Sequence, residues 1–187
     1  MTMKIFFTAA LIFFTTVPDC LCQDLFYTRE GRVSFFSEAP LENIEAHNNR
    51  GSSVLDAETG AIEFSVLIKG FMFEKSLMQE HFNENFMESD KYPRAVFKGL
   101  ILDFEKMDLS KNGTFPIVIK GEMEIREMVE EVTAEGKLIV ADGKIRGEAL
   151  FELTVADFGI QIPGVVRENI ARVVEVRVEA NFKPLER

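Results

Sequence analysis

The fold of this chain is decided by residues 77–99, which read LMQEHFNENFMESDKYPRAVFKG. Met78, Phe82 and Phe86 recur every four residues, so they form one apolar face of a short helix. Almost everything outside this stretch has the alternating pattern of strands. A single short helix in a chain made mostly of strands is not expected to form the core. We therefore expect it to cap one end of a β structure.

Both ends of this helix carry local signals. Ser76 followed by Gln79 resembles a capping box, which would satisfy the free backbone N–H groups of the first turn. Residues 85–90 supply polar residues that end it. Pro93 then blocks continuation, because proline disfavours helical geometry in the residue before it. The sequence predicts one or two helical turns followed directly by a strand.

Apolar and polar residues alternate with a period of two in most of the chain, as in half-buried strands. Short turn signals separate these segments. Asn112-Gly113 and Ala141-Asp142-Gly143 are interpreted as hairpin turns. The predicted strands are 31–36, 44–48, 61–69, 95–104, 115–125, 132–140, 144–155 and 174–182.

Strands with one apolar and one charged face indicate an all-β fold of antiparallel hairpins around one interior, not a parallel sheet covered on both sides. Closure also removes exposed sheet edges, which would promote aggregation. The pattern is compatible with an eight-stranded barrel or with a sandwich. The residues alone leave these two architectures open.

Small residues fall in register with several apolar faces, and they allow two interpretations. A narrow side chain can leave room for a ligand inside an eight-stranded barrel. Glycine can also mark a sharp bend that lets a coiled sheet close. Both interpretations apply to Gly99, Gly121, Gly136, Gly147 and Ala149.

The N-terminus has the three regions of a signal peptide. Lys4 gives a basic start, and Ile5–Val17 is an uncharged apolar run shorter than the roughly 20 residues of a spanning helix. Cys20 and Cys22 occupy positions −3 and −1 of a cut before Gln23. The residues before each cysteine fit a lipoprotein signal poorly. We expect residues 1–22 to be a cleaved signal peptide and residues 23–187 to be one domain.

Cleavage there would remove both cysteines, so the mature chain would have no disulfide, cysteine-bound metal or cysteine nucleophile. Its stability would depend on the core, and a chain of this length buries about 70% of its unfolded surface. No later apolar run is long enough to span a membrane. We expect a periplasmic or secreted protein.

The formal net charge is −10, which argues against nucleic acid and against attraction to anionic membranes. The only histidines, His47 and His81, lie in different predicted elements, so no metal site or cofactor is expected. Asp157-Phe158-Gly159 resembles a kinase motif, but no phosphate-binding loop accompanies it, and it is interpreted as a strand end. No nucleophile, base and orienting residue can be grouped. The sequence does not favour an enzyme.

Several segments together resemble the YceI-like family of exported bacterial proteins. They begin with GRVSFFS at Gly31 and continue with TGAIEFSV at Thr59 and LMQEHFNEN at Leu77. KYPRAVFKG at Lys91 is the most specific, and DFGIQIP follows at Asp157. The resemblance covers residues 31–184.

This resemblance implies a lipocalin-like, eight-stranded antiparallel barrel that holds a long isoprenoid chain, with no catalytic residues. One position departs from the family. Many relatives have a His-Gly turn where this chain has Ile125-Arg126-Glu127-Met128, so no role of that histidine can be transferred.

Two hypotheses remain. The first is an exported carrier that binds an isoprenoid or other lipid in its lumen. The second is a structural or interaction barrel of the cell envelope with a filled interior. A continuous cavity along the axis favours the carrier, and the sequence leaves a homo-oligomer open.

In the carrier hypothesis, inward apolar residues of several strands line the lumen, and the helix is either a fixed plug or a movable lid. The lid or plug residues are Met78, Phe82 and Phe86. The predicted lumen residues are Phe35, Phe64, Val66, Ile68, Phe97, Ile117, Ile119, Phe151, Leu153, Val174 and Val176.

Overall fold

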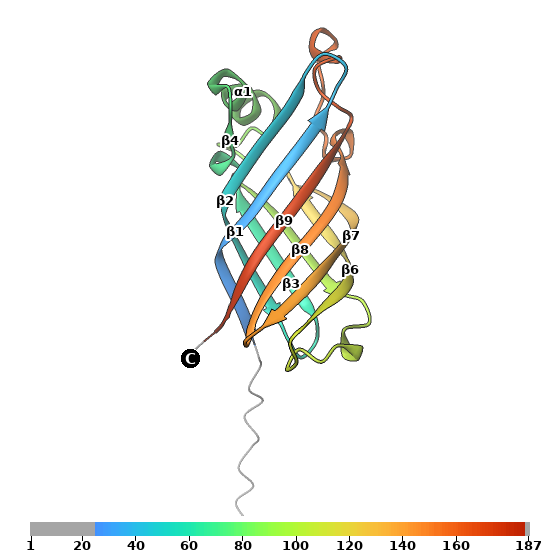
Figure 1. Cartoon of the computed structure of the whole chain (residues 1–187). Helices are drawn as coiled ribbons and strands as arrows, with labels where there is room; N and C mark the ends of the chain where they lie inside the picture. Colours follow the sequence, from blue (N-terminus) through green and yellow to red (C-terminus); the bar gives the residue numbers. More distant parts are fainter. Residues whose placement is uncertain (1–24, 186–187) are drawn as a thin grey trace, which may run out of the picture.

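The computed structural model describes residues 25–185, which form a closed antiparallel β-barrel with one short helix at one end (Figure 1). The predicted signal peptide lies outside the described residues. The strands are β1 Leu25–Glu38, β2 Asn43–Asp56, β3 Ala61–Leu67, β4 Met72–Phe73, β5 Arg94–Ile101, β6 Gly113–Ile125, β7 Met128–Ala141, β8 Lys144–Thr154 and β9 Val173–Pro184.

Eight strands close the barrel in the order β1-β9-β8-β7-β6-β5-β3-β2, and β2 pairs back onto β1. Every pairing is antiparallel. The two-residue strand β4 is an addition that pairs with Ala46 and His47 of β2. The predicted eight-stranded barrel is confirmed, and the sandwich is excluded.

Several strands are longer than the alternation predicted. β2 continues from Asn48 to Asp56 through Asn49, Gly51 and two serines, which carry no apolar signal. In the barrel, however, their backbones pair with β1 and β3. Backbone hydrogen bonds to the neighbouring strands therefore continue β2 beyond the residues at which the side-chain pattern predicted its end.

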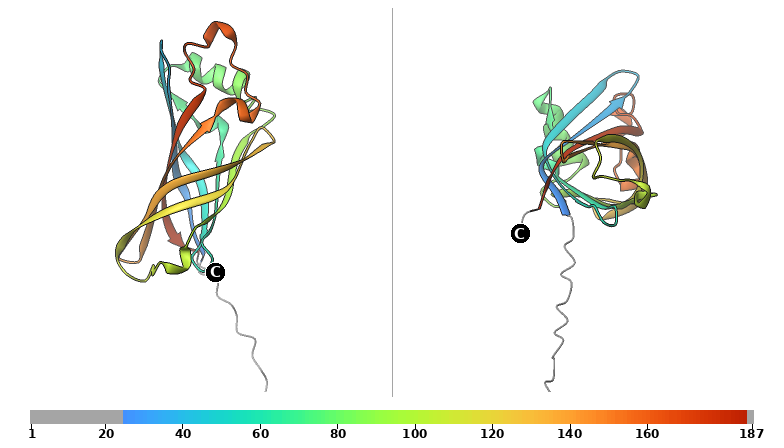
Figure 2. Two further views of the ribbon diagram at one scale, coloured as in Figure 1. Left: turned by 90° about the vertical axis from the view of Figure 1, so that its right-hand side faces the viewer. Right: turned by 60° about the horizontal axis from the view of Figure 1, so that its bottom comes forward.

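The hairpin turns only partly match the prediction. Asp142-Gly143 joins β7 to β8 as expected, with φ of 51° and 73°. Asn112-Gly113 is wrong as a hairpin, because residues 102–112 form a long connection from β5 to β6 (Figure 2, opposite end from the helix). Asn112 instead accepts a hydrogen bond through its side chain from the backbone N–H of Asp142, at 3.0 Å.

The β6–β7 turn consists of Arg126 and Glu127, both in the left-handed region, with φ of 54° and 63°. Two-residue turns of this kind normally contain Asn or Gly. A residue with a Cβ pays about 1–2 kcal/mol for left-handed geometry.

We expect Glu127→Gly to raise the free energy of unfolding by about 0.5–1 kcal/mol, since the relieved strain exceeds the entropy cost of glycine. Urea denaturation followed by circular dichroism measures the change. Glu130→Gly, in the paired part of β7, is the control and should destabilise the protein. Destabilisation by Glu127→Gly would contradict the assigned turn strain.

The helix is α1, Ser76–His81, and it continues as a π-helix over Phe82–Phe86. The predicted capping box is wrong. Lys75 is the N-cap, no side chain caps the helix, and the Gln79 side chain accepts instead from the Phe73 backbone N–H at 3.4 Å. A π-helix has more residues per turn than an α-helix, so the spacing of side chains around the helix changes from Phe82 onward.

Three of the inward glycines, Gly99, Gly121 and Gly136, lie where the backbone of the neighbouring strand comes close. Gly99 pairs with Gly121, and Gly136 pairs with Ala149. A Cβ on Gly121 would lie 2.2 Å from the Lys98 carbonyl oxygen. None of these residues borders the cavity described below. The interpretation that these residues create space for a ligand therefore does not hold for this cavity, and the interpretation that they are bends stays a prediction.

Buried apolar residues form two clusters inside the barrel. One includes Val66, Ile68 and Leu153 and lies toward α1. The other includes Leu138 and Phe182 and fills the opposite half. Within residues 25–185, no helix is long and apolar enough to cross a membrane.

Candidate ligand-binding cavity

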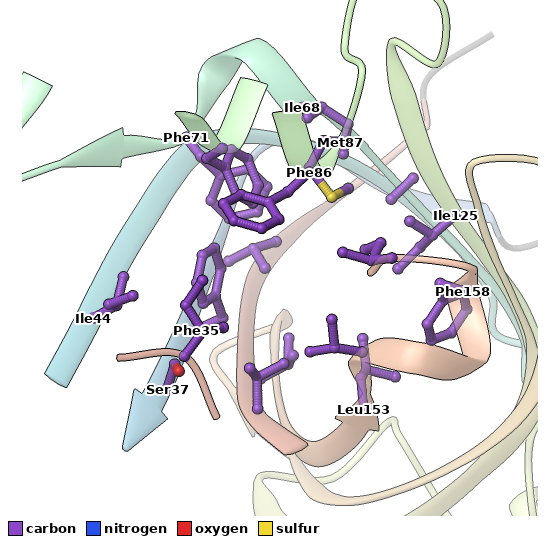
Figure 3. Close-up of a pocket in the computed structure, with 18 of the residues that line it drawn as sticks. Phe35, Ser37, Ile44, Ile68, Phe71, Phe86, Met87, Ile125, Leu153 and Phe158 are labelled. Atoms are coloured by element: carbon purple, nitrogen blue, oxygen red, sulfur yellow. The ribbon is translucent and has the colours of Figure 1, made fainter. Parts of the chain in front are cut away.

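The half of the barrel beneath α1 contains a cavity of about 360 Å³, within the usual size range of small-molecule sites (Figure 3). Phe35 and Phe71 approach it from one side, and Leu153 and Phe158 approach it from another. Among the described residues, all but four of those that line it are apolar. This end of the barrel is therefore hollow, with a hydrocarbon-like wall.

Nine of the eleven predicted lumen residues border this cavity. They come from β1, β3, β5, β8 and β9 and from the turn after β3, so distant parts of the chain meet there. Whether they contact a ligand stays a prediction. The nine are Phe35, Phe64, Val66, Ile68, Phe97, Phe151, Leu153, Val174 and Val176.

Ile117 and Ile119 lie elsewhere. Both are 5% exposed and belong to the cluster that fills the other half of the barrel. They point inward, as the alternation of β6 requires, but at the wrong depth along the barrel axis. Met123 and Ile125, farther along the same strand, border the cavity instead.

Phe97 and Phe151 form a boundary between the two halves, because each packs against both clusters. The cavity thus ends inside the barrel. The interior is neither a tunnel along the whole axis nor completely filled.

Met78, Phe82 and Phe86 all border the cavity from the helical segment. Phe82 belongs to a cluster of aromatic rings: its centroid lies 5.5 Å from that of Phe35 and 5.0 Å from that of Phe73. Ring pairs at such distances add about 0.5–1.5 kcal/mol each beyond their burial. The helix is thereby attached to the wall of the barrel, and its role as plug or lid stays a prediction.

A second covering segment, residues 155–172, was missed as a site by the sequence interpretation. It contains short 3₁₀ turns and lies at the same end as α1 (Figure 2). One signal could have revealed it: the segment is unusually apolar for a connection between strands. Its cavity-lining apolar residues are Val155, Phe158, Ile160, Ile162, Val166 and Ile170.

Arg126 connects the segments that surround this end. Its guanidinium donates to the Glu88 carboxylate and, at 3.0 Å, to the Gly159 carbonyl oxygen. It also lies 5.7 Å from the centre of the Tyr92 ring. The β6–β7 turn thus connects the end of the helical segment to residues 155–172.

Four polar residues interrupt the apolar lining: Ser37, Glu42, His81 and Asn169. The Ser37 hydroxyl accepts from the Ala171 N–H at 2.9 Å. A hydrogen bond from Lys75 lowers the pKa of Glu42 below its usual value, so Glu42 is charged at neutral pH.

The described part of the chain has no cluster of side chains suited to bind a metal ion. Among residues 25–185, no three His, Cys, Asp or Glu side chains could hold a metal ion together. His47 borders a separate groove on the barrel exterior, whereas His81 borders the cavity. The lining of the cavity is suited to enclosing apolar surface.

A closed antiparallel barrel with a hollow apolar half and a helical cap defines this chain as a small β-barrel with an internal apolar cavity. The YceI-like domain model matches residues 28–182, and the chain belongs to this family. Comparison with curated proteins gave no match.

Solved structures with the same fold share little sequence with this chain. A polyisoprenoid binding domain from Saccharophagus degradans is 8% identical, with a TM-score of 0.74 over 87% of this chain and 99% of that one. BcnA from Burkholderia cenocepacia is 14% identical, with a TM-score of 0.66 over 82% and 96%. The YceI protein of Campylobacter jejuni is 17% identical, with a TM-score of 0.54 over 78% and 89%.

Proposed function

We propose that this protein is a non-enzymatic carrier that binds an extended apolar ligand, an isoprenoid or another long-chain lipid, in the hollow half of its barrel. The observation that carries the proposal is the apolar wall of the cavity. Such a wall offers few hydrogen bonds and little charge. Affinity would come from removing hydrocarbon from water, at about 25 cal/mol per Å² before ordering costs.

The shape of the site supports a flexible chain as the ligand. Phenylalanine and methionine side chains from the wall and the helical segment surround the space, and Met78 and Met87 provide adaptable contacts. Because Phe97 and Phe151 end the cavity inside the barrel, a longer chain would enter at the α1 end and leave its remainder near the opening.

The assignment to isoprenoids is supported by family membership and by the description of the Saccharophagus degradans domain as polyisoprenoid binding. Export to the periplasm or beyond the cell is supported by the signal-peptide pattern of residues 1–22. A carrier in that compartment would keep an insoluble chain out of water.

The structural-barrel hypothesis requires a filled interior. The half that contains Leu138 and Phe182 meets that requirement, but the half beneath α1 does not. An apolar cavity of this size lowers stability unless something occupies it. This cost favours the carrier.

We expect the protein, expressed with its leader in a bacterial host, to co-purify with a long-chain lipid. Extraction with organic solvent followed by mass spectrometry would identify it, and a mock purification from cells lacking the chain is the control. Repeated absence of any enriched lipid, with no binding of an uncharged fluorescent apolar probe, would overturn the proposal.

A further inference from the structure

We propose that the ligand ends in an uncharged hydrogen-bond-donating group, such as an alcohol, that Glu42 binds at the cavity opening, and that phosphorylated counterparts are disfavoured. This inference rests on the proposed function and narrows its ligand class. It starts from the position of a carboxylate in an otherwise apolar lining.

Glu42 lies between β1 and β2, and its side chain is 26% exposed, so it borders both the cavity and solvent. Its neighbour Leu41 donates a backbone hydrogen bond to the Glu168 carbonyl at 3.0 Å, which attaches this turn to residues 155–172. The carboxylate is thereby held at the opening of the cavity.

The two oxygens of Glu42 have known partners. Lys75 donates to Oε1 at 2.6 Å, and the Asn169 side chain donates to Oε2 at 3.4 Å, a long bond. A carboxylate has about four acceptor positions, so capacity for a further donor remains. A ligand hydroxyl at the opening could therefore donate to Glu42. Hydrogen bonds to an ionised acceptor are about twice as strong as neutral ones.

The same carboxylate would repel an anionic end group. Lys75 balances part of its charge, but the lysine side chain is 62% exposed and is not part of the cavity lining. A phosphate emerging from the cavity would thus meet Glu42 before Lys75. Beside an apolar wall the repulsion is weakly screened compared with that in water. Glu74, beside the helical segment, adds negative charge near Lys75.

A competition experiment tests this inference. Three ligands that share the same twelve-carbon chain are compared for their ability to displace the bound uncharged probe N-phenyl-1-naphthylamine. They are dodecanol, dodecyl methyl ether and dodecyl phosphate. The ether cannot donate, and the phosphate is anionic. We expect dodecanol to compete at a concentration about tenfold lower than either of the others, the size of one charge-assisted hydrogen bond. If none of the three displaces a bound probe, the carrier proposal fails too. If all three compete equally, only the end-group inference fails.

Variants locate the effect. In Glu42→Gln, the concentrations at which dodecanol and dodecyl phosphate displace the probe should differ by no more than about threefold. Lys75→Gln removes the balancing positive charge, so it should increase the ratio between the displacing concentrations of dodecyl phosphate and dodecanol. Glu84→Gln is the matched control, because Glu84 is exposed and lies outside the cavity lining. The inference would be overturned if Glu84→Gln reduced this concentration ratio as much as Glu42→Gln does. It would also be overturned if the ratio changed in neither Glu42→Gln nor Lys75→Gln.

Discussion

Ala95→Phe should lower the affinity for any apolar ligand by about 100-fold, since the new ring would displace roughly 100–150 Å² of ligand contact, worth about 25 cal/mol per Å². Ala95 is a small residue of β5 that borders the cavity. Its neighbours across the sheet, Val66 and Ile125, border it as well. A larger side chain here therefore has only the cavity to occupy. Titration with N-phenyl-1-naphthylamine measures the loss.

The stability of the same variant separates occlusion from misfolding. A ring that fills an apolar void should leave the free energy of unfolding unchanged or raise it. The matched control is Val96→Phe, because Val96 alternates to the outer face of β5, opposite Ser65 and Glu124. Val96→Phe should bind the probe normally. Undiminished binding by a folded Ala95→Phe protein would contradict the position of the site.

Gly121→Ala should lower the free energy of unfolding by about 3 kcal/mol, the upper part of the usual range for overpacking. The new methyl group would lie 2.2 Å from the Lys98 carbonyl oxygen and 2.5 Å from the Gly99 Cα. Both are backbone atoms in the paired strand β5, so neither can rotate away. Relief requires the β5–β6 pair to separate, which costs ladder hydrogen bonds.

Chemical denaturation measures this loss, with Gly164→Ala as the control. Apart from its chain neighbours and its own helical turn, a methyl group on Gly164 would have no atom within 4 Å, so this substitution should change stability by less than about 0.5 kcal/mol. An equally small effect at Gly121 would mean that β5 and β6 are farther apart than described.

Much of the architecture could be predicted because a strand has a period of two. Alternation in residues 115–125 and 174–182 identified inward faces that the barrel confirms. The helix after Lys75 was likewise predicted from the spacing of Met78, Phe82 and Phe86. These are local properties, in which each residue reports on neighbours a few positions away.

The long connections were predicted less well, because their conformation depends on partners far along the chain. Asn112 carries a hairpin signal, yet its side chain bonds the turn at Asp142. Residues 155–172 have no regular period, although Phe158 is 2% exposed and helps to enclose the cavity. The polar contacts of Glu42 at the cavity opening could not be predicted either, because Lys75 and Asn169 are distant in the sequence and reach Glu42 only in the closed barrel.

The sequence by itself determined an all-β chain with one capping helix and determined which side of most strands faces inward. Only the tertiary structure decided what lies at each inward position. Ile119 is in the packed half and Leu153 borders the cavity, although both are aliphatic residues on inward faces. The physical reason is that periodicity reports the face of a strand, whereas depth along the barrel depends on strand tilt and on which distant segments cover each end.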